Sequence, residues 1–140
     1  MVPNLDMRPI RLLYIENDPA LRNILGKMLA ASSQIELLGS YAGADEVIDK
    51  TLLRKADVAL IDFALDQNGL NGIELGIALR SINEYIGITI YSQFSVRPMV
   101  HRVPKSMRAG WSFFNKSAEM DVEDYVRAVS YTHLTLPTKA

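Results

Sequence analysis

The feature that most constrains the fold is a short strand without polar alternation, Val58-Ala59-Leu60-Ile61. A strand has this pattern when both of its faces are buried, as in a parallel sheet covered by helices. Similar apolar runs alternate along the chain with stretches whose apolar residues repeat at helical spacing. Strands are expected at 10–15, 35–41, 58–61, 86–91 and 111–115, and helices at 20–31, 44–54, 72–82, 98–109 and from 121 onward. This order predicts an α/β fold, a doubly wound five-stranded parallel sheet flanked by helices, with the last helix truncated.

The bulk composition is typical of one globular domain. The chain has 140 residues, of which 49% are hydrophobic and 22% charged, so it can bury a core. A net charge of -1 lacks the basic footprint of a nucleic-acid-binding domain. The absence of cysteine excludes disulfides and thiolate metal sites and fits a reducing compartment. Without a long apolar run or a signal-peptide pattern, we expect a cytoplasmic domain over residues 8–129.

Polar side chains stand at the ends of four expected strands. These residues are Glu16, Asn17 and Asp18, then Asp62, then Ser92, and then Asn115 and Lys116. Each is commonplace alone, and Asp18 is most simply explained as the N-cap of the next helix. The carboxyl ends of parallel strands nevertheless share one ligand-binding edge. Clustered carboxylates attract a cation, and Mg²⁺ is favoured because carboxylate oxygens are hard ligands. A carboxylate beside Mg²⁺, an ammonium and a hydroxyl is equipped to accept a phosphoryl group.

Four stretches resemble the receiver domains of two-component response regulators. Residues 10–22 are similar to the first strand and acidic pocket of that family, and residues 56–62 with 71–75 to its phosphoacceptor segment. Residues 88–92 resemble the strand that carries a Thr or Ser, and residues 109–116 the strand with the switch aromatic and the lysine. The resemblance spans about residues 8–129 and implies the flavodoxin-like receiver fold. It also implies that the chain is the N-terminal part of a longer response regulator.

The resemblance assigns a role to each residue of the site. It implies that Asp62 accepts a phosphoryl group from a histidine kinase, with Mg²⁺ as the cofactor. It implies metal ligands at Glu16, Asn17, Asp62 and the main-chain carbonyl of Ala64. Lys116 would pair with the phosphate, and Ser92 would bind one of its oxygens. Phe113 would then turn inward as Ser92 moves, which makes Phe113 the switch residue.

The resemblance also sets expectations for partners and output. A histidine kinase is the expected partner, and transcription is the expected output. DNA would be contacted only through a C-terminal domain that this chain lacks, and no membrane partner is expected. We also expect a homodimer through the face formed by the fourth helix, the fifth strand and the fifth helix.

Two other functions are compatible with parts of the pattern. Asn17 occupies a position where receivers usually have a metal-binding Asp, so the domain could instead be a degenerate receiver that binds proteins without phosphorylation. A small Mg²⁺-dependent phosphohydrolase is the third reading. Haloacid-dehalogenase phosphatases, which also form an aspartyl phosphate, require a second Asp where this chain has Ala64. We therefore expect a switch rather than an enzyme.

The C-terminal segment 130–140 has an unusual composition for this fold. Residues 129–138 resemble one reading frame of a transposase sequencing adapter, and the alternative is a natural strand-like tail. Thr132 and Thr135 are weak helix formers, and Pro137 breaks helices. We therefore expect the last helix to fray near residues 131–134.

Overall fold

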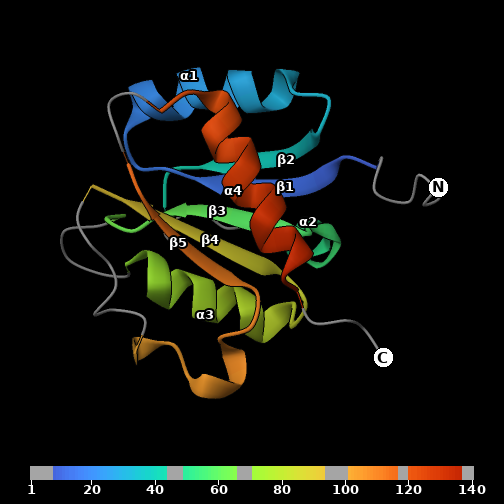
Figure 1. The fold of residues 1–140 in the computed structure, drawn as a ribbon, viewed down its shortest axis with the longest axis vertical. Helices are drawn as coiled ribbons and strands as arrows, with labels where there is room; N and C mark the ends of the chain where they lie inside the picture. The colour runs from blue at the N-terminus through green and yellow to red at the C-terminus, as the bar shows by residue number, and fades with distance from the viewer. Residues whose placement is uncertain (1–7, 44–48, 66–70, 94–100, 117–119, 137–140) are drawn as a thin grey trace.

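The computed structural model describes residues 8–43, 49–65, 71–93, 101–116 and 120–136. Five parallel strands form one sheet in the order β2-β1-β3-β4-β5 (Figure 1). The strands are β1 (Ile10–Ile15), β2 (Ile35–Tyr41), β3 (Val58–Asp62), β4 (Gly87–Ser92) and β5 (Trp111–Asn115). The helices are α1 (Pro19–Ala31), α2 (Lys50–Lys55), α3 (Gly72–Ile82) and α4 (Val122–Leu134), together with the 3-10 helix η3 (Lys105–Met107). The predicted doubly wound parallel sheet is confirmed.

Two apolar cores lie on opposite faces of the sheet. Helices α1 and α4 pack on one face around Tyr14 and Leu60, and helices α2 and α3 pack on the other around Leu13 and Ile61. Every residue of β3 is buried, as the unbroken apolar run of this strand predicted. Both faces of the sheet are covered by helices. A polar site is therefore expected at the edge where the carboxyl ends of the strands lie.

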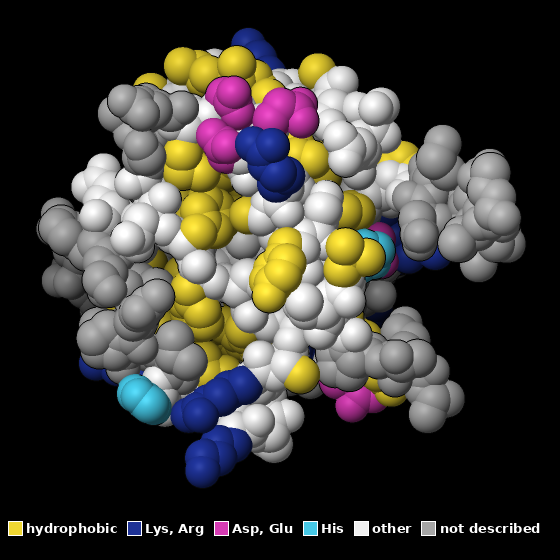
Figure 2. Space-filling view, viewed as in Figure 1, with side chains coloured by type: hydrophobic (Ala, Val, Ile, Leu, Met, Phe, Trp, Pro, Cys, Tyr) yellow, Lys and Arg dark blue, Asp and Glu magenta, His cyan; other side chains and the backbone are white. Residues whose placement is uncertain are grey.

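Polar caps set where the principal helices begin. The Asp18 carboxylate accepts hydrogen bonds from the N–H groups of Ala20 and Leu21, and Pro19 occupies the first helical position of α1. Helix α4 begins with a reciprocal capping box between Asp121 and Asp124. Figure 2 shows acidic side chains gathered over the beginning of α4. None of the described helices is long and apolar enough to cross a membrane.

The predicted fourth helix, at 98–109, is wrong over its described part. Residues 94–100 lie outside the described residues, and the segment before β5 contains the short helix η3 instead of an α-helix. Pro104 has no N–H to donate, and its carbonyl accepts the Met107 N–H in a 3-10 turn. The surface predicted for a homodimer therefore lacks an α-helix over residues 101–109. Part of the predicted second helix, residues 44–48, also lies outside the described residues, and α2 ends at Lys55.

The expectation that the last helix frays near residues 131–134 is also wrong. Helix α4 continues to Leu134, and Thr132 is fully buried in it. The Thr132 hydroxyl lies 2.7 Å from the hydroxyl of Thr89 on β4, and it also donates to the Ala128 carbonyl. Tertiary contact with the sheet therefore outweighs the weak helix propensity of threonine. The origin of segment 130–140 remains a prediction.

Candidate functional site

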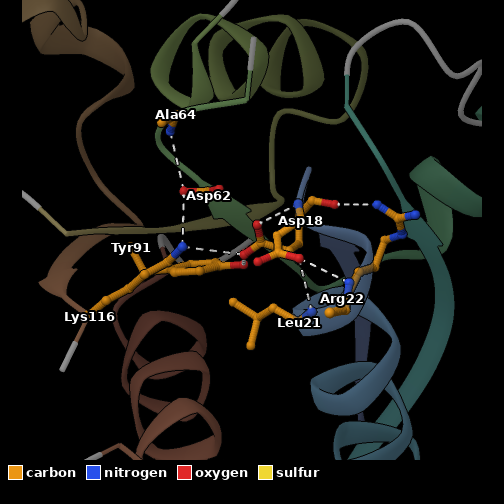
Figure 3. A network of polar contacts seen from close by, with 9 residues as sticks. Asp18, Leu21, Arg22, Asp62, Ala64, Tyr91 and Lys116 are labelled. Carbon is orange, nitrogen blue, oxygen red and sulfur yellow. Dashed lines mark hydrogen bonds and ion pairs between the residues drawn. The ribbon is translucent and has the colours of Figure 1, made fainter. Parts of the chain in front are cut away.

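Three charged side chains converge at the carboxyl edge of the sheet. Glu16 follows β1, Asp62 ends β3, and Lys116 follows β5. The Lys116 ammonium lies 3.4 Å from Glu16 Oε1 and 3.5 Å from Asp62 Oδ1 (Figure 3). The Lys116 N–H donates to the Ser92 carbonyl, which anchors the lysine main chain to the end of β4. One cation thus lies against two buried carboxylates.

The Glu16 carboxylate is fully buried and held by donors from several elements. Its Oε1 accepts a 2.6 Å hydrogen bond from the Tyr91 hydroxyl, and its Oε2 accepts a 3.0 Å hydrogen bond from the Asp18 N–H. The Glu16 carbonyl accepts a hydrogen bond from the Arg22 guanidinium. Burial raises the pKa of Tyr91 well above its ordinary value, so this phenol remains a neutral donor.

Asp62 is buried at the end of the central strand, with 4% of its surface exposed. Its Oδ1 accepts a 3.3 Å hydrogen bond from the Ala64 N–H. Burial and then the negative charge of Glu16 raise the pKa of Asp62 to about 7, whereas Lys116 and the Ala64 N–H oppose the rise. An added cation would stabilise the ionised form of Asp62, because the cation offsets the repulsion between the two neighbouring carboxylates.

Two curated relatives match part of the chain. One is a protein-glutamate methylesterase/protein-glutamine glutaminase of Clostridium acetobutylicum, 24% identical over 110 residues, which are 79% of this chain and 31% of the relative. The other is a response regulatory protein of Vibrio cholerae, 32% identical over 87 residues, which are 61% of this chain and 36% of the relative. The chain thus spans about a third of the length of these relatives. No protein-family model matches the chain.

Several solved structures with the same architecture come from response regulators. The receiver domain of NarL from Mycobacterium tuberculosis has a TM-score of 0.65 at 19% identity, covering 91% of this chain and 98% of that chain. A LuxR-family response regulator from Aurantimonas has a TM-score of 0.70 at 18% identity, with coverages of 90% and 86%. A CheY-like receiver protein from Methanospirillum hungatei has a TM-score of 0.64 at 16% identity, with coverages of 89% and 94%. The chain has the receiver fold of response regulators.

The receiver fold places the other predicted site residues in different environments. Ser92 is buried at the end of β4, whereas the Asn17 side chain is exposed in the loop after β1. Phe113 is half-buried and stacks on Trp111, with 6.0 Å between the ring centroids. Ala64 presents its N–H to Asp62. The structure thus brings Glu16, Asp62 and Lys116 into direct contact, while the roles predicted for Asn17, Ser92, Phe113 and the Ala64 carbonyl remain predictions.

Tyr91 is a residue of this site that the sequence reasoning missed. The sequence predicts it only as the last residue of the fourth strand, yet its hydroxyl reaches Glu16 from two strands away in the sheet. The available signal was a tyrosine at the end of a mostly apolar strand, directly before the predicted site residue Ser92. A buried phenol requires a hydrogen-bond partner, and the strand end is where one could be expected.

The pocket offers two carboxylates to a divalent cation, and oxygen ligands are those that such a cation prefers. Glu16 and Asp62 supply the carboxylates, and the Asn17 amide and the Ala64 carbonyl are hard oxygen atoms nearby in sequence. Within the described ranges, no group of three His, Cys, Asp or Glu side chains could hold a metal ion. Metal binding at this edge would therefore depend on neutral ligands and water as well as the two carboxylates.

Proposed function

We propose that the chain is the phosphoacceptor receiver of a two-component response regulator, with Asp62 as the acceptor of a phosphoryl group from a histidine kinase. The observation that carries the proposal is the placement of Asp62, which is buried at the end of the central strand with Oδ1 3.5 Å from the Lys116 ammonium. The neighbouring Glu16 carboxylate makes the same pocket suitable for a divalent cation.

The proposed reaction is one phosphoryl transfer. An Asp62 carboxylate oxygen attacks the phosphorus of the kinase phosphohistidine, so that a P–O bond forms as the P–N bond breaks and the imidazole leaves with the electron pair. Bound Mg²⁺, held by Glu16, Asp62, Asn17 and the Ala64 carbonyl, would neutralise charge on the phosphoryl oxygens. Lys116 offsets the same charge, and the Ser92 hydroxyl binds one oxygen.

The switch and its output extend this proposal. Movement of Ser92 toward the phosphoryl group would open space for Phe113, since the two residues lie on the neighbouring strands β4 and β5. A phosphoryl group shifts such an equilibrium only by its differential affinity for the two states. We infer a cytoplasmic protein whose output, regulation of transcription, depends on a DNA-binding domain outside this chain. We also propose that the chain dimerises through β5 and α4, where α4 is the helix that the sequence predicts from residue 121 onward.

Phosphorylation of Asp62 is directly testable. We expect incubation with acetyl phosphate and Mg²⁺ to add one hydroxylamine-labile phosphoryl group, and Asp62→Asn to abolish it, because an amide cannot take over the nucleophilic role. Intact-mass spectrometry is the measurement. Asp49→Asn is the matched control, since it changes an exposed helix cap to a residue that caps equally well and should leave phosphorylation unchanged. An Asp62→Asn chain that still gains the labile group would refute the assignment.

The second candidate is a degenerate receiver that binds proteins without phosphorylation. It is favoured by Asn17, which stands in the loop after β1 and brings no negative charge to the pocket. An acetyl phosphate experiment in which the wild-type chain gains no mass would support this candidate.

Asn17 makes a quantitative prediction about metal binding. Asn17→Asp should tighten Mg²⁺ binding by about three- to tenfold, roughly 1 kcal/mol, because a carboxylate adds charge that an amide lacks. Calorimetric titration with MgCl₂ measures the change, and the phosphorylation rate should rise with it. Asn23→Asp, an exposed position on α1, provides the same change in net charge away from the pocket. Equal affinities in the wild type and Asn17→Asp would remove residue 17 from the ligand set.

A further inference from the structure

The Tyr91 hydroxyl forms a short hydrogen bond in the acidic pocket. It donates to Glu16 Oε1 at 2.6 Å, a length typical of a charge-assisted bond between a hydroxyl and a carboxylate. Tyr91 belongs to β4 and Glu16 follows β1, and β3 lies between these two strands in the sheet. The tyrosine therefore crosses the end of the central strand, where Asp62 stands, to reach its partner.

We propose that Tyr91 is a positioning residue that fixes the Glu16 carboxylate for binding a divalent cation. The inference rests on the proposed function, because it gives Tyr91 a role in the same Mg²⁺ site. It concerns the orientation of the Glu16 carboxylate, which the roles predicted for Asp62, Ser92 and Lys116 do not explain.

The contacts of Glu16 show why the phenol matters for its orientation. The terminal torsion of a glutamate side chain is soft, so the plane of a carboxylate is set mainly by its hydrogen bonds. Oε2 is held by the Asp18 N–H, and Oε1 is held by Tyr91 at 2.6 Å and by the Lys116 ammonium at the longer distance of 3.4 Å. Without the phenol, the hydrogen bond that Oε1 keeps among the described residues is the longer one from the Lys116 ammonium. The carboxylate could then rotate out of the orientation that the pocket imposes.

The Tyr91 ring is itself immobilised by its neighbours. It stacks on Phe114 of β5 with 5.9 Å between centroids, and it meets Tyr125 of α4 edge to face at 5.6 Å. The Lys116 ammonium lies 4.8 Å from the centroid of the Tyr91 ring (Figure 3). All three contacts involve the ring and not the hydroxyl. A phenylalanine at this position would therefore preserve the packing and the cation–π contact while it removes the bond to Glu16.

The test is a titration of the intact chain with MgCl₂, followed by calorimetry. We expect Tyr91→Phe to weaken Mg²⁺ binding by about tenfold or more, which is the usual effect of removing a group that orients a metal ligand. Tyr131→Phe removes the same hydroxyl from an exposed position on α4 and should leave the affinity unchanged. In a double-mutant cycle, Tyr91→Phe should have little further effect in a Glu16→Gln background, because the carboxylate that it orients is gone.

The outcomes separate this inference from the proposed function. Equal Mg²⁺ affinity in Tyr91→Phe and the wild type would overturn the positioning role while leaving Asp62 phosphorylation intact. Weaker binding in Tyr91→Phe, together with a wild-type chain that acetyl phosphate does not modify, would support the positioning role and refute the phosphoacceptor. A folded wild-type chain that does not bind Mg²⁺ overturns the inference. A thermal melt of each variant verifies folding, and Tyr91→Leu, which also removes the ring, shows how far loss of packing differs from loss of the hydroxyl.

Discussion

Replacing Arg80 by alanine is expected to lower the free energy of unfolding by about 3–5 kcal/mol. Arg80 lies on α3 with 6% of its surface exposed, and its guanidinium donates to three main-chain carbonyls. The acceptors are Ile86, Met107 and Ala109, at 2.8, 3.1 and 2.9 Å. Without the guanidinium, each carbonyl loses its hydrogen-bond donor. The free-energy cost is about 1–3 kcal/mol for each carbonyl, and it is smaller where water can enter. Urea unfolding at neutral pH measures the difference.

The expected loss arises because the Arg80 guanidinium joins α3 to the segments that precede β4 and β5. Ile86 directly precedes β4, and Met107 and Ala109 precede β5. Arg80→Lys should recover only part of the stability, because an ammonium cannot present the planar set of donors that a guanidinium does. Arg127→Ala is the control, since that side chain is exposed and forms a surface ion pair with Asp124, worth about 0–1 kcal/mol. A loss below about 1 kcal/mol in Arg80→Ala would show that solvent replaces the three hydrogen bonds.

Replacing Asp62 by asparagine is expected to stabilise the chain at pH 8 by about 2–3 kcal/mol while it abolishes phosphorylation. Burial and the Glu16 charge raise the pKa of Asp62 from 3.8 to about 7 in the folded chain. The folded state therefore holds this proton more tightly than the unfolded state does. The stability that Asp62 contributes is complete below about pH 4 and is lost as the pH rises through about 7. A rise of about three units in the pKa of Asp62 corresponds to a loss of at most about 4 kcal/mol in the free energy of unfolding.

The pH dependence distinguishes this effect from a general stabilisation. The advantage of Asp62→Asn over the wild type should be small at pH 4, grow between pH 4 and 7, and level off above pH 7. Urea unfolding across this range, without metal, is the measurement. Glu123→Gln changes an exposed carboxylate on α4 and should follow the wild-type profile. If the wild type is as stable as Asp62→Asn at pH 8, Lys116 compensates the Asp62 charge more fully than burial opposes it.

The destabilising charge of Asp62 is consistent with a site that functions at the expense of stability. A carboxylate buried beside a second carboxylate is unfavourable until a cation or a transferred group changes the local charge. Lys116 supplies part of that compensation in the structure, where it contacts both acids. The two predictions therefore describe opposite situations, since Arg80 is buried with its donors satisfied and Asp62 is buried with its charge only partly offset.

The order of strands and helices could be predicted from the sequence because both patterns are local. The unbroken apolar run of β3 indicated burial on both faces, and Asp18 with Pro19 marked the beginning of α1. Parallel strands bring their carboxyl ends to one edge, so Glu16, Asp62 and Lys116 could be expected to meet before any coordinate was known. Their contacts of 3.4 and 3.5 Å agree with that expectation.

Contacts between distant parts of the chain were decided only by the tertiary structure. Tyr91 and Glu16 are 75 residues apart, and their hydrogen bond depends on β3 separating β4 from β1. Arg80 reaches carbonyls 27 and 29 residues further along the chain, and the buried contact of Thr132 with Thr89 keeps α4 helical to Leu134. Sequence periodicity determines which face of an element is buried, because it reflects local geometry. Which polar group meets which depends on strand order and register, and these are set by packing across the whole sheet.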